Sequence, residues 1–316
     1  MYHSISEGLC PWELAVSPGV FAGQLEILTK HASVMSLSDM LAGLDRGMLP
    51  ERCVAITFDD GYADNLEAAK PILEQFECPA TVFVVAGLVG SQQPFWWDEL
   101  AHLTLTPCEL PKVVRLMIDG RPFSFPLGDD AVIDRSPSGD GSWRFHEPPP
   151  TGRHRLLQAV WERLQLASGE IRRQALDELR RQAQLDDARA LDRRIMDANE
   201  VARLSEGGLI EIGAHTMTHP ILARLPVANQ IDEIKQSKTT LEQITGKPVS
   251  DFSYPHGGRA DYSQATVQAV RDAGFRSSCT TIEDWLRPNV DRYQLPRIHV
   301  PPASGTDFER LLSYWL

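Results

Sequence analysis

The chain has 316 residues, enough to bury a sizeable core, and its 42% hydrophobic and 23% charged residues are typical of an ordinary soluble globular protein. The formal net charge is −12 at pH 7, and we find no basic stripe with interleaved aromatic residues, so nucleic acid and anionic membrane surfaces are not expected partners. No apolar run of about 18 residues occurs, and the first residues lack the basic and apolar regions of a signal peptide. We therefore expect a cytoplasmic protein without an integral membrane segment.

The cysteines do not form a recognisable pattern. There are 5 of them, widely spaced and without a CxxC pair. This odd number favours free thiols over a disulfide framework or a zinc knuckle.

The first third of the chain has the rhythm of an α/β protein. Apolar periodicity predicts helices at 18–31, 37–47 and 64–76, the last kinked or broken at Pro71, and buried strands at 54–58 and 80–85. The order strand, helix, strand implies a parallel pair and hence an α/β fold.

Between about 92 and 197 the pattern changes. A short helical piece begins near Trp96, a β-hairpin at 113–125 turns at Asp119-Gly120, and charged helices follow near 153–167 and 170–184. We interpret this span as a mixed α+β insertion or subdomain whose helices cover the rest of a single domain, 1–316.

The α/β rhythm then resumes. Helices are predicted from Asp197 to about 207, at 227–245, 261–273 and 307–316, and strands at 209–212, 249–254, 275–280 and 295–300. About six or seven β/α units favour one barrel over two separate domains.

Two adjacent carboxylates, Asp59 and Asp60, end the strand at 54–58 and precede Gly61. Neighbouring carboxylates repel each other, so they usually persist where a cation or an arginine compensates them or where one acts as a base. The alternative is an Asp-Gly turn with solvated acids.

Two histidines, His215 and His219, follow another strand end and are four residues apart. Such a pair can be two ordinary polar residues. In a parallel barrel, however, strand ends converge at one face, which would bring both histidines to Asp59 and Asp60. One carboxylate with two imidazoles is a common open zinc-type ligand set.

Two further strand ends carry polar residues. The stretch 253–257 contains Pro255 and Gly257 and could aim amide N–H groups into a pocket, or it could be a plain turn. Arg297 and His299 share one face of the last strand, directed either into the site or to the surface.

The motifs together resemble the polysaccharide deacetylases with the NodB homology domain, carbohydrate esterase family 4. Residues 57–61 match its first motif, 215–219 its second and 253–257 a variant of its third, and Tyr2-His3 resembles the start of the family domain. The resemblance covers roughly 1–92 and 198–300. It implies a deformed (β/α)7 TIM-like barrel and metal-dependent hydrolysis of the N-acetyl group of an acetylated amino sugar or glycan intermediate, a carbon-nitrogen bond other than a peptide bond.

The resemblance also implies residue roles. Asp60, His215 and His219 would bind a divalent metal, zinc first, with cobalt, nickel or manganese as alternatives. Asp59 would be the general base for a metal-activated water, and the backbone N–H of Tyr254 would stabilise the oxyanion.

The chain departs from the family pattern at two roles. The family's arginine that orients the base does not precede Tyr254 closely, so Arg297 or Arg259 is expected to replace it. For the general acid, His299 lies in about the right place, and His256 is a competing candidate.

The roles of three tryptophans and the function of the protein each have more than one interpretation. Trp96 and Trp97 could form a sugar-stacking platform or anchor the insertion. Trp285 resembles part of the fourth family motif or lies in a surface loop. The alternatives to an acetylated-sugar deacetylase are a hydrolase of another linear or cyclic amide and a non-catalytic carbohydrate-binding relative. The sequence does not predict the oligomeric state.

Overall fold

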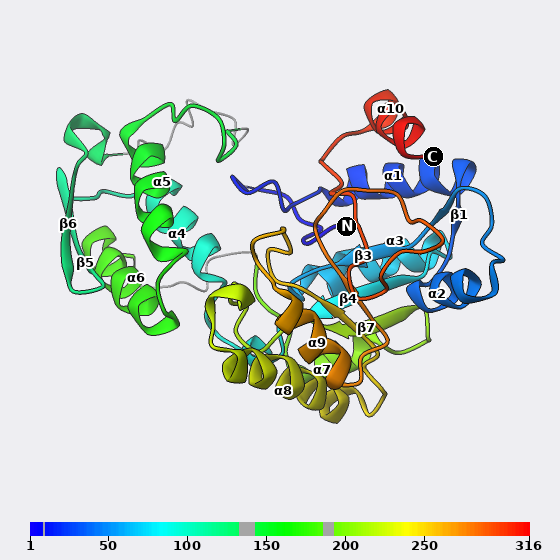
Figure 1. Ribbon diagram of the computed structural model, residues 1–316. Helices are drawn as coiled ribbons and strands as arrows, with labels where there is room; N and C mark the ends of the chain where they lie inside the picture. The colour runs from blue at the N-terminus through cyan, green and yellow to red at the C-terminus, as the bar shows by residue number, and fades with distance from the viewer. Residues whose placement is uncertain (9, 133–142, 186–192) are drawn as a thin grey trace. The chain divides into compact units, whose positions relative to one another are not determined.

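A computed structural model describes residues 1–8, 10–132, 143–185 and 193–316 (Figure 1). The chain forms two compact units, the first made of 1–7, 15–91 and 195–316 and the second of 8–14 and 92–194. The second unit has nearly the bounds predicted for the insertion. The single catalytic domain around it stays a prediction.

The first unit is built on a five-stranded parallel sheet with the order β3-β4-β7-β8-β9. Its strands are β3 (Ile56–Phe58), β4 (Ala80–Val84), β7 (Ile210–Ala214), β8 (Asp251–Ser253) and β9 (Ser277–Cys279). All residues of β4 are buried, because one face of a barrel strand packs in the barrel interior and the other packs against helices, and this explains its largely apolar run.

Two irregular segments complete the barrel. Leu295 forms a parallel bridge with Cys279, and Tyr2 forms one with Phe58. The two segments also meet, since the Val300 N–H donates to the Met1 carbonyl oxygen at 3.1 Å. The α/β class and the deformed (β/α)7 barrel are thus confirmed. The predicted strand at 295–300 is not regular, since Pro296 has no N–H to donate to a ladder.

The helices of the first unit begin and end close to their predicted positions. They are α1 (Pro18–His31), α2 (Leu37–Arg46), α3 (Lys70–Gln75), α7 (Ala198–Leu204), α8 (Val227–Thr245), α9 (Gln264–Asp272) and α10 (Gly305–Trp315). Short β1 (Ser33–Val34) and β2 (Cys53–Val54) pair in parallel, and η2 (Ala86–Leu88) and η5 (Leu222–Arg224) are single 3-10 turns. Helices α8 and α9 lie side by side against the sheet (Figure 1).

The helix predicted at 64–76 has a π-helical start. Residues Asn65–Ala69 form η1, a π-helix, and α3 follows from Lys70. Pro71 lacks an N–H, so the turn before it cannot continue an ordinary α-helical hydrogen-bond ladder. The predicted irregularity at Pro71 is therefore confirmed.

The second unit has a hydrophobic core of its own. Its elements are α4 (Trp96–Leu105), β5 (Val113–Ile118), β6 (Arg121–Pro126), η3 (Gly128–Ala131), α5 (Gly152–Leu164) and α6 (Gly169–Ala183). The predicted hairpin is confirmed, and its turn has left-handed φ angles of 51° at Asp119 and 69° at Gly120, which suits a tight hairpin. Helices α5 and α6 both pack against α4, and α6 also packs against β5.

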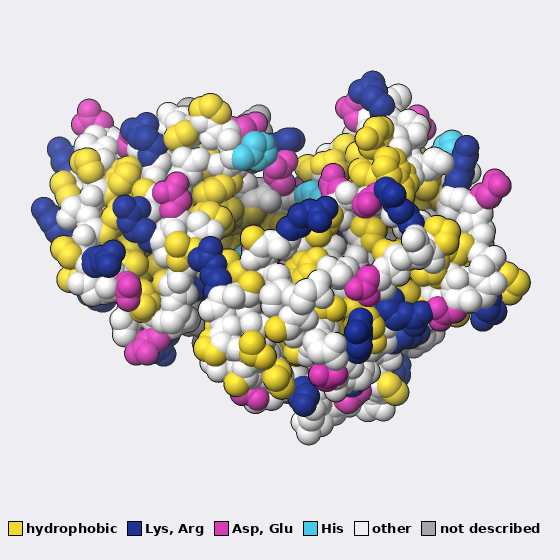
Figure 2. Space-filling model, viewed as in Figure 1, with side chains coloured by type: hydrophobic (Ala, Val, Ile, Leu, Met, Phe, Trp, Pro, Cys, Tyr) yellow, Lys and Arg dark blue, Asp and Glu magenta, His cyan; other side chains and the backbone are white. Residues whose placement is uncertain are grey.

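Within the described residues, no helix combines the length and the apolar character needed to cross a bilayer. On the face drawn in Figure 2, basic and acidic side chains are interspersed over the surface.

Candidate active site

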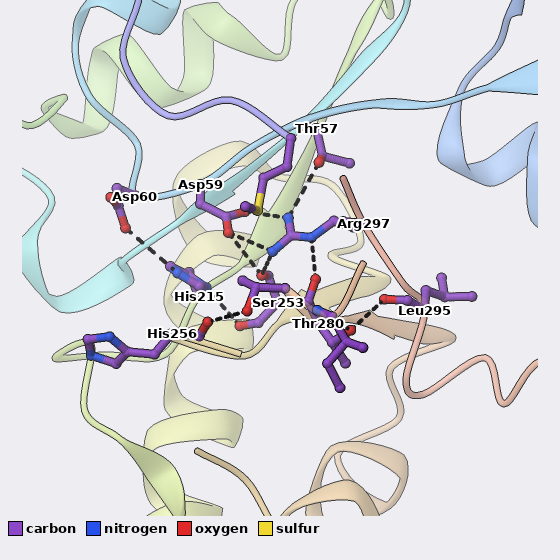
Figure 3. A network of polar contacts seen from close by, with 12 residues as sticks. Thr57, Asp59, Asp60, His215, Ser253, His256, Thr280, Leu295 and Arg297 are labelled. Atoms are coloured by element: carbon purple, nitrogen blue, oxygen red, sulfur yellow. Dashed lines mark hydrogen bonds and ion pairs between the residues drawn. The ribbon is translucent and has the colours of Figure 1, made fainter. Parts of the chain in front are cut away.

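Polar residues from three strand ends and from the irregular segment 295–300 meet at one end of the barrel (Figure 3). Asp59 and Asp60 follow β3, His215 follows β7, and Ser253 ends β8. Arg297 joins them from the irregular segment 295–300. All five side chains are buried, so each charge in this cluster needs a compensating partner.

Asp60 and the two histidines form a set of possible metal ligands. Asp60 Oδ1 lies 3.7 Å from His215 Nε2 and 3.3 Å from His219 Nε2, and one donor atom of each residue lies within 4.8 Å of the others. Asp60 Oδ1 is buried and has no hydrogen-bond partner in the described part of the chain. The set therefore fits a divalent cation, which would provide that oxygen with a partner.

The protonation of His215 suits a metal ligand. Its Nδ1 lies 2.7 Å from the Ser253 carbonyl oxygen, which can only accept, so Nδ1 carries the proton and the Nε2 lone pair faces Asp60. Burial lowers the pKa of His215 to about 4, although the nearby Asp59 charge opposes this. Burial also raises the pKa of Asp60, and a bound cation would favour its ionised form.

Asp59 forms a two-point ion pair with Arg297. Arg297 Nη1 donates to Asp59 Oδ1 and Nη2 to Oδ2, both at 2.7 Å, and Nη2 also donates to Ser253 Oγ at 2.8 Å. Burial alone would raise the pKa of Asp59, but the Arg297 charge outweighs it and holds this pKa well below the ordinary 3.8. Arg297 thus points inward, whereas Arg259 is exposed.

Several residues around the site have a backbone conformation that non-glycine residues rarely adopt. Asp60, Thr216, His219 and His256 have φ angles of 78°, 67°, 56° and 61°. Such angles cost about 1–3 kcal/mol each and persist where the surrounding structure enforces them. Their concentration here indicates that the ligand-bearing loops are held in a defined shape.

The prediction for Tyr254 is wrong. Its N–H donates to the Cys279 carbonyl oxygen at 3.1 Å, as part of the pairing between β8 and β9, and is not available to an oxyanion. Pro255 has no N–H, so His256 carries the next backbone N–H after that of Tyr254. The His256 ring lies 5.0 Å from the His219 ring.

His3 is a residue near the site to which sequence reasoning gave no role. Its ring lies 6.1 Å from that of His299, and Asn65 Nδ2 donates to its carbonyl oxygen at 2.7 Å. Burial lowers the pKa of His3 to about 4, while the charges of Asp60 and Asp59 act in the opposite direction. The resemblance at Tyr2-His3 was the signal that could have drawn attention to it.

The tryptophan positions favour structural roles. Trp97 is 7% exposed and stacks on Phe95 at 4.5 Å, while the Arg172 guanidinium covers the Trp96 ring at 4.9 Å. Both rings therefore belong to the packing of the second unit. Trp285 is 48% exposed and packs on Trp315, as expected for a surface loop.

The first unit is thus a parallel β/α barrel with a buried cluster of carboxylate, imidazole and guanidinium groups at one end. A model of the polysaccharide deacetylase family matches residues 46–119 and 181–278, more than half of the chain. The chain therefore belongs to the polysaccharide deacetylase family.

Similar curated proteins match over shorter stretches. The protein YxkH of Bacillus subtilis is 35% identical over 112 residues, 33% of this chain and 37% of that protein. A poly-beta-1,6-N-acetyl-D-glucosamine N-deacetylase of Staphylococcus aureus is 37% identical over 79 residues, 25% of this chain and 27% of that enzyme. The matches thus span less than half the length of these relatives.

Solved structures show the same fold over nearly the whole chain. The deacetylase PplD of Streptococcus pyogenes has a TM-score of 0.59 at 19% identity, covering 99% of this chain and 95% of that one. IcaB of Ammonifex degensii has a TM-score of 0.60 at 18% identity, covering 99% and 94%.

Proposed function

We propose that this protein is a divalent-metal-dependent carbohydrate N-deacetylase, which hydrolyses the acetamide group of an acetylated amino sugar or glycan intermediate. The observation that carries the proposal is an ionised carboxylate, Asp59, fixed by Arg297 directly beside the Asp60, His215 and His219 cluster. The family membership and the printed activity of the Staphylococcus aureus relative support it.

The metal would be held by Asp60, His215 and His219, with zinc as the first expectation and cobalt, nickel or manganese as alternatives. Such a cation supplies Lewis acidity, which lowers the pKa of water and polarises a carbonyl group.

Asp59 is the proposed general base. It accepts the proton of the attacking water, and its ion pair with Arg297 keeps the carboxylate ionised and fixes its orientation. The same ion pair makes Asp59 a weak base, because it lowers the pKa of the carboxyl group. Arg297 is thus a positioning residue whose role is to aim a carboxylate, not to increase its basicity.

His299 is the proposed general acid. The neighbouring His3 is a poor proton donor, because a pKa of about 4 leaves it neutral at pH 7. We assign the backbone N–H of His256 to the oxyanion in place of Tyr254, because it is the next backbone N–H after that of Tyr254 and the His256 ring lies beside the His219 ring.

Two other functions remain as alternatives, hydrolysis of another amide and binding of a carbohydrate without catalysis. The Asp59–Arg297 pair favours catalysis, because a binding protein has no use for a fixed, ionised carboxylate beside a cation site.

Acetate release tests the proposal. The metal-loaded protein is incubated with acetylated chitooligosaccharides, acetylated nucleotide sugars and poly-β-1,6-N-acetylglucosamine, with and without a chelator, and Asp59→Asn serves as the inactive control. We expect chelator-sensitive acetate release from at least one substrate. Equal release by the wild type and by Asp59→Asn would contradict the proposal. Ring opening of a cyclic amide, without acetate release from any acetylated sugar, would favour the alternative hydrolase.

A further inference from the structure

The loop that carries both histidines is held by a carboxylate from another element. Glu233, in α8, accepts hydrogen bonds from the Met217 N–H at 2.8 Å and the Thr218 N–H at 2.9 Å through Oε2. Its Oε1 accepts the Thr218 hydroxyl at 2.7 Å. One carboxylate thus binds three donors from the residues that lie between His215 and His219.

The opposite side of this loop is held by backbone groups. The Ala86 and Gly87 N–H groups of η2 donate to the Thr216 and Met217 carbonyl oxygens at 2.9 and 3.0 Å. Within the loop, the His219 N–H donates to Thr216 Oγ1 at 3.0 Å. The N–H groups of η2 therefore donate hydrogen bonds to the carbonyl oxygens of the loop, and Glu233 accepts hydrogen bonds from the N–H groups of the loop.

The loop conformation needs such support. Thr216 and His219 both have left-handed φ angles, 67° and 56°, which non-glycine residues adopt only when the surroundings enforce them. Without Glu233, two adjacent amides and a hydroxyl lose their acceptor, and the loop can relax toward ordinary backbone angles. Because His219 lies at the end of the loop, such a relaxation would move its Nε2 away from Asp60.

We infer that Glu233 is a positioning residue of the metal site: it fixes the distance between His215 and His219 through the loop between them, without being a ligand. Both of its carboxylate oxygens accept bonds from loop donors, and it is not part of the ligand cluster. The inference rests on the proposed metal site but not on the nature of the substrate.

Metal affinity of the full chain tests this inference. The dissociation constant of zinc is measured by competition with a chromophoric chelator for the wild type, Glu233→Ala and Glu233→Gln. Asp232→Asn is the matched control, since Asp232 is an exposed acid one residue earlier in α8. We expect zinc binding to weaken about 10–100-fold in Glu233→Ala, as for other residues that orient ligands. Glu233→Gln should weaken less, because its amide oxygen still accepts, and Asp232→Asn should match the wild type.

Circular dichroism and thermal unfolding of the metal-free variants separate positioning from folding. If metal-free Glu233→Ala does not fold, Glu233→Gln decides, because it keeps the side-chain shape. Unchanged zinc affinity in the folded Glu233 variant, or equal weakening by Asp232→Asn, overturns the inference. Failure of the wild type to bind zinc or the other divalent cations would instead refute the metal site itself.

Discussion

Arg297 and Asp59 are joined by two parallel hydrogen bonds of 2.7 Å across 238 residues of sequence. Replacing Arg297 with Met leaves the buried Asp59 carboxylate without its counter-charge, which typically costs about 3–5 kcal/mol. We expect the free energy of unfolding to fall by this amount, as measured with urea. The double variant Arg297→Met/Asp59→Asn should be less destabilised than the sum of the two single variants. Simple additivity would show that the pair is not coupled.

The same pair predicts how stability depends on pH. The pKa of Asp59 in the folded protein lies below the ordinary 3.8, so its stabilising contribution is fully present above about pH 4 and is lost as the pH falls through the folded-state value. We expect Asp59→Asn to flatten the acid part of a plot of melting temperature against pH, below about pH 4. An unchanged slope of melting temperature against pH below about pH 4 would contradict the lowered pKa of Asp59.

The pH dependence of kcat/KM should also change when Arg297 is replaced. Removal of the guanidinium raises the pKa of Asp59, because burial then acts unopposed by the largest favourable charge. In Arg297→Met the acid limb of the profile should therefore move to higher pH. Arg259→Met, at an exposed arginine, is the control and should leave the profile where it is.

The two adjacent aspartates should have different functions, metal binding for Asp60 and base catalysis for Asp59. His215→Ala, His219→Ala and Asp60→Asn should lose stoichiometric metal, because each removes a ligand. Asp59→Asn should keep the metal while acetate release falls about 10²–10⁴-fold, the usual contribution of a general base. Metal content by plasma mass spectrometry, alongside acetate release, checks both. Metal loss in Asp59→Asn alone would mean that the two roles are reversed.

The proton donor is tested by comparing two histidines. His299→Gln should lower kcat about 10²–10⁴-fold and remove the alkaline limb of the pH profile. His3→Gln should keep that limb, because a pKa of about 4 leaves His3 neutral at pH 7. The reverse result would assign the acid to His3.

Gly87 should be sensitive to even one added carbon. A Cβ there would lie 2.5 Å from the Met217 carbonyl oxygen, so Gly87→Ala must push away the loop between His215 and His219. We expect a destabilisation of about 1–3 kcal/mol together with weaker metal binding. Gly90→Ala is not a suitable control, because Gly90 has a φ of 78° and an alanine there would be strained. The control is Gly23→Ala, because a Cβ at Gly23 meets nothing within 4 Å. This variant should bind metal as the wild type does.

Much of the fold and the assembly of the candidate ligands could be predicted from the sequence. Asp60, His215 and His219 each follow a strand, and parallel strands end at the same side of a barrel. The topology alone therefore predicts that these three side chains lie close together. The direction of Arg297 could not be predicted in the same way. A period of two divides a strand into two faces without saying which one is inside, and the segment around Pro296 is not a regular strand.

The error at Tyr254 was an error of one or two residues. Pairing between β8 and β9 continues to the Tyr254 N–H, which donates to Cys279, and sequence patterns do not fix strand ends with that accuracy. His3 was overlooked because it lies in no periodic element. Its place beside His299 depends on contacts of residues 3–5 with Asp64 and Asn65, in which Ser4 Oγ donates to Asp64 Oδ2 at 2.6 Å.

The closure of the barrel by its first and last segments also determines when the site can exist during synthesis. At about 5–20 residues per second, Arg297 leaves the ribosome roughly 10–50 s after Asp59. Until then the nascent chain contains two adjacent carboxylates without their guanidinium partner, and β3 lacks the segments that complete the barrel. The early β/α units are therefore expected to stay open and to depend on chaperones, and the active site forms only after Arg297 has emerged.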